Sequence, residues 1–389
     1  MSQPKRLLLI GGGHAHLFVL EALRRRRTEW HGRLDVTLVS RDLHTPYSGM
    51  LPGLIAGHYR PRECHVDLQP LASAAGIELT QASVRQINFA ARIAHADTGA
   101  WPFDLVSLDI GAAPALAAVP GAAEHACAIK PIPLFLEQWQ QFQALLQRAR
   151  QSGEPVPAQH LVVVGGGAGG VEAALAIAAR LAPWRTQVKC SLVTAGALLP
   201  GYPRRTARLL ARHLAKAGVA LRQQARVVAV EDGRLLFADG SAAAFDRLLW
   251  ATGAAPQAWL AASGLACDAN GFIVINRQLQ SASHPDVFAA GDIASCAQDP
   301  RPKAGVFAVR QGPFLAENLL RHALQPLRPL LSYRPQHDYL SLVSTGARHA
   351  VASWHGLAWQ GDWVWRWKDR IDRRFMQRFS APFEADVPA

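Results

Sequence analysis

The sequence contains one pattern twice, roughly 150 residues apart: a short, wholly apolar run that ends in glycines and leads directly into a helical pattern. The first apolar run is Leu7–Ile10 and the second is Leu161–Val164. Second strands are expected at residues 34–39 and 188–194, after the helical patterns. Continuous apolar runs of this length are typical of strands buried on both faces of a parallel sheet. The sequence therefore predicts an α/β fold with two Rossmann-like, three-layer units.

The second glycine pattern reads Gly165-x-Gly167-x-x-Gly170 between a predicted strand and a predicted helix. The first glycine permits the tight turn, the second lets a pyrophosphate approach the backbone, and the third allows close helix–strand packing. A phosphate at this place meets the free N–H groups of the helix N-terminus. This pattern predicts dinucleotide binding.

The first pattern, Gly11-x-Gly13-x-x-His16, carries histidine where the third glycine is usual. Two interpretations are open for His14 and His16. Either they act in catalysis, or His14 lies beside the pyrophosphate while His16 fills a gap in the core. We expect the second.

An acidic residue at the end of the second strand of such a unit normally binds the adenosine ribose. Here the first unit ends in Ser40-Arg41, and the second ends in Thr194. An acidic residue at this place would disfavour the 2′-phosphate of NADPH, and neither unit has one. Both NADH and NADPH are therefore compatible with the sequence.

Three later segments carry a resemblance to a known superfamily. They are Val287–Asp292, Leu248–Gly253 and a degraded counterpart of the latter at Asp109–Gly111. With the two glycine patterns, the chain resembles the pyridine nucleotide–disulfide reductase superfamily of flavoproteins. The resemblance implies that the first unit binds FAD, that the second binds NADH or NADPH, and that Asp292 hydrogen-bonds the ribityl chain of FAD.

The resemblance also implies that the second domain is inserted into the first. The expected domains are residues 1–115 with 256–329 for FAD, 116–255 for NAD(P)H, and 330–389 for a C-terminal hairpin and amphipathic helix. The expected cofactor contacts are Gly11, Gly13, His14, Ser40, Arg41, Pro46, Gly111, Gly291, Asp292, Gly305, Val306, Phe307, Gly165, Gly167, Gly170, Thr194 and Gly253.

Within the superfamily, several segments resemble type II NADH dehydrogenases. They are the crossover at residues 121–130, Glu172, the helix at 303–319 and the hairpin at 342–354. Residues 11–16 and 46–53 are also similar to the flavoprotein domain fused to some bacterial selenophosphate synthetases. The resemblance implies electron transfer from NAD(P)H through FAD to a small acceptor such as a quinone. Glu172 would position the nicotinamide, and Lys303 would add positive charge near the acceptor.

The positions of the cysteines differ from those in disulfide reductases, which place a cysteine pair against the flavin. The matching region, residues 46–53, holds no cysteine. Cys127 and Cys296 leave an alternative open, because sulfide:quinone reductases use cysteines beside the flavin. The protein would then be a sulfide- or selenium-linked reductase. A third alternative is an FAD redox sensor with little turnover. We expect both thiols to be structural.

The segment 363–379 is helical in pattern, rich in tryptophan and densely charged. It fits a basic amphipathic helix lying on an anionic membrane, or a helix that packs its tryptophan face on the protein or on a second subunit in a homodimer. We expect a cytoplasmic protein, peripheral on the inner membrane face in the first case.

The overall composition limits the kinds of partner and the cellular compartment that we expect for this protein. The formal net charge is +12, and Arg24–Arg27 falls where the first helix should end, as a solvated terminus. No zinc-type Cys/His spacing and no RNA-binding signature occurs, so we expect neither a metal site nor a nucleic-acid partner. Five widely spaced cysteines are typical of a reducing compartment. No apolar run approaches the roughly 18 residues that a membrane-spanning helix needs.

Overall fold

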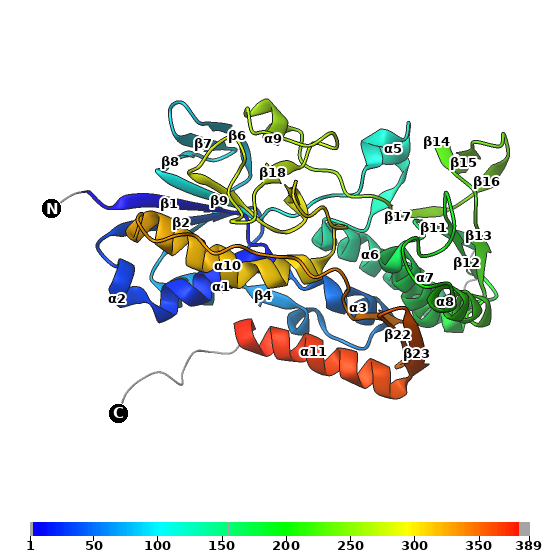
Figure 1. Ribbon diagram of the computed structural model, residues 1–389. Coiled ribbons are helices and arrows are strands. Elements are labelled where there is room, and N and C mark those ends of the chain that lie inside the picture. Colours follow the sequence, from blue (N-terminus) through cyan, green and yellow to red (C-terminus); the bar gives the residue numbers. More distant parts are fainter. Residues whose placement is uncertain (1–2, 154–155, 157, 381–389) are drawn as a thin grey trace.

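Two five-stranded, wholly parallel sheets form the two halves of the molecule (Figure 1). The structure is a computed structural model that describes residues 3–153, 156 and 158–380. The first sheet has the order β19 (Val287–Ala289), β9 (Leu105–Leu108), β1 (Lys5–Ile10), β2 (Leu34–Ser40) and β5 (Glu78–Gln81). The second has the order β10 (Cys127–Ala128), β17 (Arg247–Trp250), β11 (Gln159–Val164), β12 (Val188–Val193) and β13 (Val219–Arg222). The predicted fold class is confirmed.

The chain enters the second sheet and then returns to the first. Strands β1, β2, β5 and β9 precede every strand of the second sheet, whereas β19 follows all of them. The late strand β19 pairs with β9, with Val287 opposite Val106. The second unit is therefore inserted into the first, as expected. The boundaries at residues 116, 256 and 330 stay predictions.

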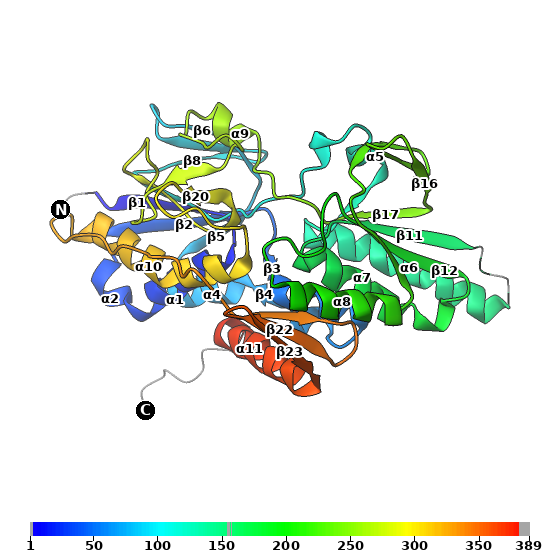
Figure 2. The same cartoon turned by 45° about the vertical axis from the view of Figure 1, so that its right-hand side comes forward.

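Helices cover the faces of both sheets (Figures 1 and 2). The longer ones are α1 (His14–Arg25), α6 (Ile132–Ser152), α7 (Ala168–Arg180), α8 (Arg204–Lys216) and α10 (Gly305–Leu324). The shorter ones are α2 (Arg27–Trp30), α3 (Leu51–Ala56), α4 (Leu68–Ala75), α5 (Ala122–His125) and α9 (Trp259–Ala262). Strands outside the two large sheets are β3 (His44–Pro46), β4 (His65–Asp67), β6 (Val84–Asn88), β7 (Ile93–Ala96), β8 (Ala100–Pro102), β14 (Val227–Glu231), β15 (Arg234–Phe237), β16 (Ala242–Ala244), β18 (Ile273–Ile275) and β20 (Ala294–Cys296).

The C-terminal region is a small antiparallel sheet followed by a helix. Its elements are β21 (Ser341–Ser344), β22 (Ala350–Trp354), β23 (Leu357–Gly361) and α11 (Asp362–Ser380). The sequence predicted two of these strands and missed β23. In Figure 2 this region lies beneath both units. The expected C-terminal region ran to residue 389, and its last nine residues lie outside the described part of the chain.

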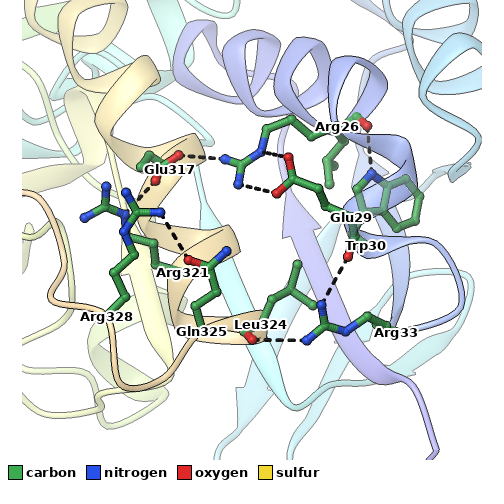
Figure 3. A network of polar contacts seen from close by, with 10 residues as sticks. Arg26, Glu29, Trp30, Arg33, Glu317, Arg321, Leu324, Gln325 and Arg328 are labelled. Atoms are coloured by element: carbon green, nitrogen blue, oxygen red, sulfur yellow. Dashed lines mark hydrogen bonds and ion pairs between the residues drawn. The ribbon is translucent and has the colours of Figure 1, made fainter.

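The helices α1 and α10 pack against each other under the first sheet, and an ionic network joins their ends (Figure 3). The Arg26 guanidinium contacts Glu317 at 2.6 Å and Glu29 at 2.6 Å. Arg321 also contacts Glu317, at 2.6 Å. The predicted helix end is in place, since α1 stops at Arg25. The basic run is not simply solvated, because Arg26 joins this network.

We expect Gly312→Ala to destabilise the protein, because a methyl group at Gly312 of α10 would come within 2.3 Å of the Phe18 ring of α1. Overpacking of this kind costs about 1–3 kcal/mol. Urea unfolding measures the change. The matched control is Gly169→Ala in α7, where an added methyl group meets nothing within 4 Å and the lost backbone freedom favours alanine by about 0.5–1 kcal/mol. Equal effects of the two substitutions would contradict the close approach of α1 and α10.

Candidate functional site

A cavity of about 670 Å³ opens where the strands of the first sheet end. Such a crevice outside the carboxyl ends of parallel strands is where this kind of fold binds ligands, and its volume suits a cofactor. The cavity wall comes from the loops after β1, β2, β9 and β19 and from the start of α10. Ten of the expected cofactor contacts line it: Gly11, Gly13, His14, Ser40, Arg41, Pro46, Gly111, Gly291, Asp292 and Gly305.

The two glycine turns achieve the same close packing in different ways. In the second unit, a methyl group on Gly170 would lie 2.0 Å from the carbonyl oxygen of Gly165, so only glycine fits. In the first unit His16 stands at that position. Its Nδ1 lies 2.6 Å from the carbonyl oxygen of Gly11, and its Nε2 lies 2.8 Å from Ser107 Oγ. His16 is fully buried, so it packs in the core as expected.

His14 faces the cavity from the first turn of α1. Its Nε2 lies 3.3 Å from the carbonyl oxygen of Pro46, and its ring contacts Tyr47 and Phe375. Burial lowers the pKa of His14 to about 4. The ring is therefore neutral at physiological pH and donates or accepts a hydrogen bond without adding charge.

A lysine from the inserted unit reaches across to the first unit inside the cavity. Lys130 Nζ contacts Asp292 Oδ2 at 3.0 Å, and both residues line the cavity. Asp292 was predicted as a cofactor contact, whereas Lys130 was recognised only as part of the crossover. The pair places one positive and one negative group at the junction of the two units.

Glu172 lies in a second polar cluster, between α7 and the C-terminal region. Its Oε1 accepts a hydrogen bond from the N–H of Ser344 at 2.7 Å. Burial raises the pKa of Glu172 to about 7, against the opposing effects of the charge on Lys368 and of the Ser344 N–H. The carboxyl group thus exchanges its proton near neutral pH, a property common among functional groups.

The rest of this cluster comes from α11. Lys368 Nζ donates to the carbonyl oxygen of Gly49 at 2.6 Å and to Asp372 Oδ2 at 2.7 Å. Asp372 is buried. Burial raises the pKa of the Tyr47 hydroxyl, and the nearby Asp372 carboxylate raises it further. Neither Lys368 nor Asp372 was predicted as a site residue, because the sequence shows them only as two charges within a densely charged helical segment.

Comparison with known proteins identifies the fold family. The profile of the pyridine nucleotide-disulphide oxidoreductase family matches residues 5–312. The chain belongs to this family. It is 25% identical over 305 residues to the NADH dehydrogenase-like protein YutJ of Bacillus subtilis, covering 76% of this chain and 78% of that protein.

Two solved structures share the fold of this flavoprotein. The sulfide:quinone oxidoreductase of Aquifex aeolicus superposes with a TM-score of 0.79 at 18% identity, covering 97% of this chain and 91% of the other. NDH2 of Plasmodium falciparum, solved in complex with NADH, superposes with a TM-score of 0.79 at 14% identity, covering 97% and 99%. Family and relatives establish an NAD(P)H-dependent flavoprotein oxidoreductase that binds FAD and NAD(P)H.

The residues present fit these cofactors. The flavoprotein cavity is bounded by a glycine turn, by the start of α10 and by the Lys130–Asp292 pair. In the second unit, a methyl group on Gly167 would meet nothing within 4 Å, which leaves the backbone open to a pyrophosphate. Of the expected contacts, Gly165, Gly167, Gly170, Thr194 and Gly253 belong to this second unit and do not line the large cavity.

Besides Glu172 and the residues of the second unit, three further predicted residues lie away from the cavity wall. Val306 and Phe307 are in the first turn of α10 but do not line the cavity. Lys303 Nζ donates to the carbonyl oxygen of Ala294 at 2.6 Å and lies 3.8 Å from the centre of the Phe272 ring. Burial lowers the pKa of Lys303. The lysine in the cavity wall is therefore Lys130, and a role for Lys303 near the acceptor stays a prediction.

Neither of the two cysteines singled out in the sequence lines the flavoprotein cavity. Cys127 lines a separate cavity of about 160 Å³ in the inserted unit, and burial raises the pKa of its thiol to about 11. Cys296 Sγ lies 3.5 Å from Gln298 Oε1. Since the thiolate is the reactive form, the raised pKa makes Cys127 a poor nucleophile at neutral pH.

We expect Glu172→Gln to lose less stability between pH 5 and pH 8 than the wild type does, because it removes one of the buried carboxyl groups that hold a proton in this window. The carboxyl pKa is about 7 in the folded protein against 4.5 for an exposed glutamate. Between these values the folded protein holds a proton that the unfolded chain has lost, so stability falls as pH rises through this window. A difference of about 2.5 pH units corresponds to at most about 3 kcal/mol. Urea unfolding of the apoprotein at pH 5 and pH 8 measures it.

The control for this experiment is Glu124→Gln on α5, since the Glu124 side chain is 80% exposed. It should retain the wild-type pH dependence. If Glu172→Gln loses stability between pH 5 and pH 8 as steeply as the wild type, the protonation assigned to Glu172 is wrong.

Proposed function

We propose that this protein transfers hydride from NADH or NADPH to FAD and passes the electrons from the flavin directly to a small quinone-class acceptor. The observation that carries the proposal is the cavity wall, which has no cysteine among the described residues that form it. A dithiol relay requires a thiol in contact with the flavin. The similarity in fold to the sulfide:quinone oxidoreductase of Aquifex aeolicus supports a quinone as the class of acceptor.

The chain's own groups are proposed to orient the cofactors and set their charge environment. When bound, FAD supplies the redox chemistry by accepting hydride from the nicotinamide. The helix α10 begins at Gly305 in the cavity wall, and the positive end of a helix favours negative charge nearby. Lys130 adds a cation, and Asp292 an acceptor for hydroxyl groups. Glu172 is proposed to position the nicotinamide.

A stopped-flow experiment tests the proposal. NADH or NADPH should bleach the bound flavin rapidly, and a short-chain quinone should restore its colour in a second step. Cys127→Ser and Cys296→Ser should keep near-native rates in both steps. A loss of about 100-fold in reoxidation, equal to about 2.7 kcal/mol in the barrier, with FAD still bound, would favour sulfur or selenium chemistry. Slow flavin reduction in the wild type would favour a redox sensor.

The same protein is proposed to attach peripherally to an anionic membrane through α11. The inward face of this helix carries Val364, Trp365, Lys368, Asp372, Met376 and Phe379, of which all but the partly exposed Lys368 are buried. The outward face carries Trp363, Arg366, Trp367, Arg370, Ile371 and Arg374. Trp363 and Ile371 are 51% and 41% exposed.

This arrangement corrects one expectation, because the tryptophans divide between the two faces of α11 rather than packing together on the protein. Trp363 and Trp367 stack on the outer face, with ring centres 6.4 Å apart. Exposed aromatic rings flanked by arginines are typical of helices that lie in a membrane interface. Within residues 3–380, apart from 154, 155 and 157, none of the helices combines the length and apolar character that a membrane-crossing segment requires. The homodimer and the cytoplasmic location stay predictions.

We expect the triple substitution Arg366→Glu, Arg370→Glu and Arg374→Glu to weaken binding to vesicles containing anionic phospholipid by about 100-fold or more. Each basic group near such a surface contributes about 1 kcal/mol. Vesicle sedimentation at fixed ionic strength measures the affinity. The matched control replaces three exposed arginines of the inserted unit by glutamate: Arg148, Arg150 and Arg185. Equal losses in both variants would point to a nonspecific effect of net charge and contradict a role for the α11 face.

A further inference from the structure

Asp109 occupies the turn between β1 and α1, although it comes from the end of a different strand, β9. Its side chain is 2% exposed, and it belongs to the wall of the large cavity. Asp109 Oδ2 accepts hydrogen bonds from the N–H of Ala15 at 2.7 Å and from the N–H of His16 at 3.1 Å. Both N–H groups lie in the first turn of α1, where helices lack intrahelical partners, and the His16 N–H is shared with the carbonyl oxygen of Gly13 at 3.1 Å. The carboxyl group therefore caps the helix that the FAD domain presents to its cofactor.

The inserted unit provides an internal comparison. A methyl group on Gly11 would lie 2.5 Å from the carbonyl oxygen of Asp109, and one on Gly165 would lie 2.6 Å from that of Ala251. Asp109 and Ala251 thus occupy equivalent positions in the two units. The first unit has a carboxyl group where the second has only a methyl group.

This difference decides what fills the space above each glycine turn. A methyl group on Gly13 would lie 2.2–2.4 Å from the carboxyl atoms of Asp109, whereas one on Gly167 would meet nothing within 4 Å. The second turn is open to the pyrophosphate of NAD(P)H. At the first turn, the carboxyl group of Asp109 fills the space that is open at the second turn.

The charge on this carboxyl group then matters for cofactor binding. Both backbone N–H groups bond to Oδ2, which leaves Oδ1 able to carry a proton. A methyl group added to Gly291 would lie 2.7 Å from Oδ1. Burial raises the pKa of Asp109 to about 7, with a further upward contribution from the negative charge of Asp292 and opposing contributions from the two N–H bonds. An ionised carboxylate here would repel the diphosphate.

We propose that Asp109 is a cofactor-positioning residue that carries a proton in the FAD complex and presents its Oδ1–H to the FAD diphosphate. The other charged or titratable groups around it are His14 and His16 on α1, Asp292 after β19, and Lys130 from the inserted unit. Burial lowers the pKa of both histidines to about 4, so neither changes charge between pH 6 and pH 9. Above about pH 7, FAD binding must take up one proton.

The proposal predicts how FAD affinity depends on pH. Because one proton is bound with the cofactor, the Kd for FAD should be flat below about pH 7 and rise up to tenfold per pH unit above it, or about 100-fold by pH 9. Titration of the apoprotein with FAD, followed by quenching of flavin fluorescence, measures this slope.

Asp109→Asn is the decisive variant. Its amide oxygen can accept the bonds from Ala15 and His16, and its NH₂ group takes the place of Oδ1–H without ionising. We expect its Kd for FAD to vary less than about threefold between pH 6 and pH 9, and to be far lower than that of the wild type at pH 9. A wild-type slope in Asp109→Asn would overturn the proposal.

A second measurement does not depend on the variant folding. Calorimetric titration of the wild-type apoprotein with FAD at pH 8, in two buffers with different ionisation enthalpies, counts the protons taken up. Close to one proton per FAD supports the proposal, and none overturns it. The test concerns FAD binding alone, so it stands whatever the electron acceptor is.

Discussion

The close contact between the first turn of a helix and the end of a buried strand is the constraint on which the rest of this structure depends. In the inserted unit the contact is made by bare backbone, with Gly170 against the carbonyl oxygen of Gly165. In the first unit a buried imidazole makes it, with His16 bonded to Gly11 and Ser107. Because each helix leaves its strand at this turn, the carboxyl ends of the parallel strands stay open, and the cavity forms there.

The C-terminal region contacts both units. Ser344 of β21 bonds to Glu172 of α7, while Lys368 of α11 bonds to Gly49 in the first unit. Burying a charge is costly unless it is paired and its hydrogen bonds are made. Lys368 meets both conditions, through Asp372 and Gly49. These polar contacts therefore act together with the buried apolar side chains of Val364, Trp365, Met376 and Phe379 to set the position of α11.

The sequence predicted the parts of the structure that local spacing determines. Strand–turn–helix order, the late strand before Asp292 and the helix from Gly305 depend on patterns within about ten residues, and the structure bears them out. The sequence did not reveal which lysine reaches the cavity, since Lys130 and Asp292 are 162 positions apart. Lys303 is nearer in sequence, yet it turns to Ala294. Asp109 gave a usable signal, because an acid stands there in place of the alanine of the second copy.

The two nucleotide sites differ in how much of the protein surrounds them, and this difference matches the division of labour in a flavoprotein. The turn at Gly167 presents open backbone, which suits a nicotinamide nucleotide that must enter and leave with each turnover. The turn at Gly13 is enclosed by Asp109 from β9, by Lys130 from the inserted unit and by the first turn of α10. Groups from three distant segments must come together there before a cofactor is held. A site of this kind is completed only by folding of the whole chain, which suits a flavin that stays bound while NAD(P)H and acceptor exchange.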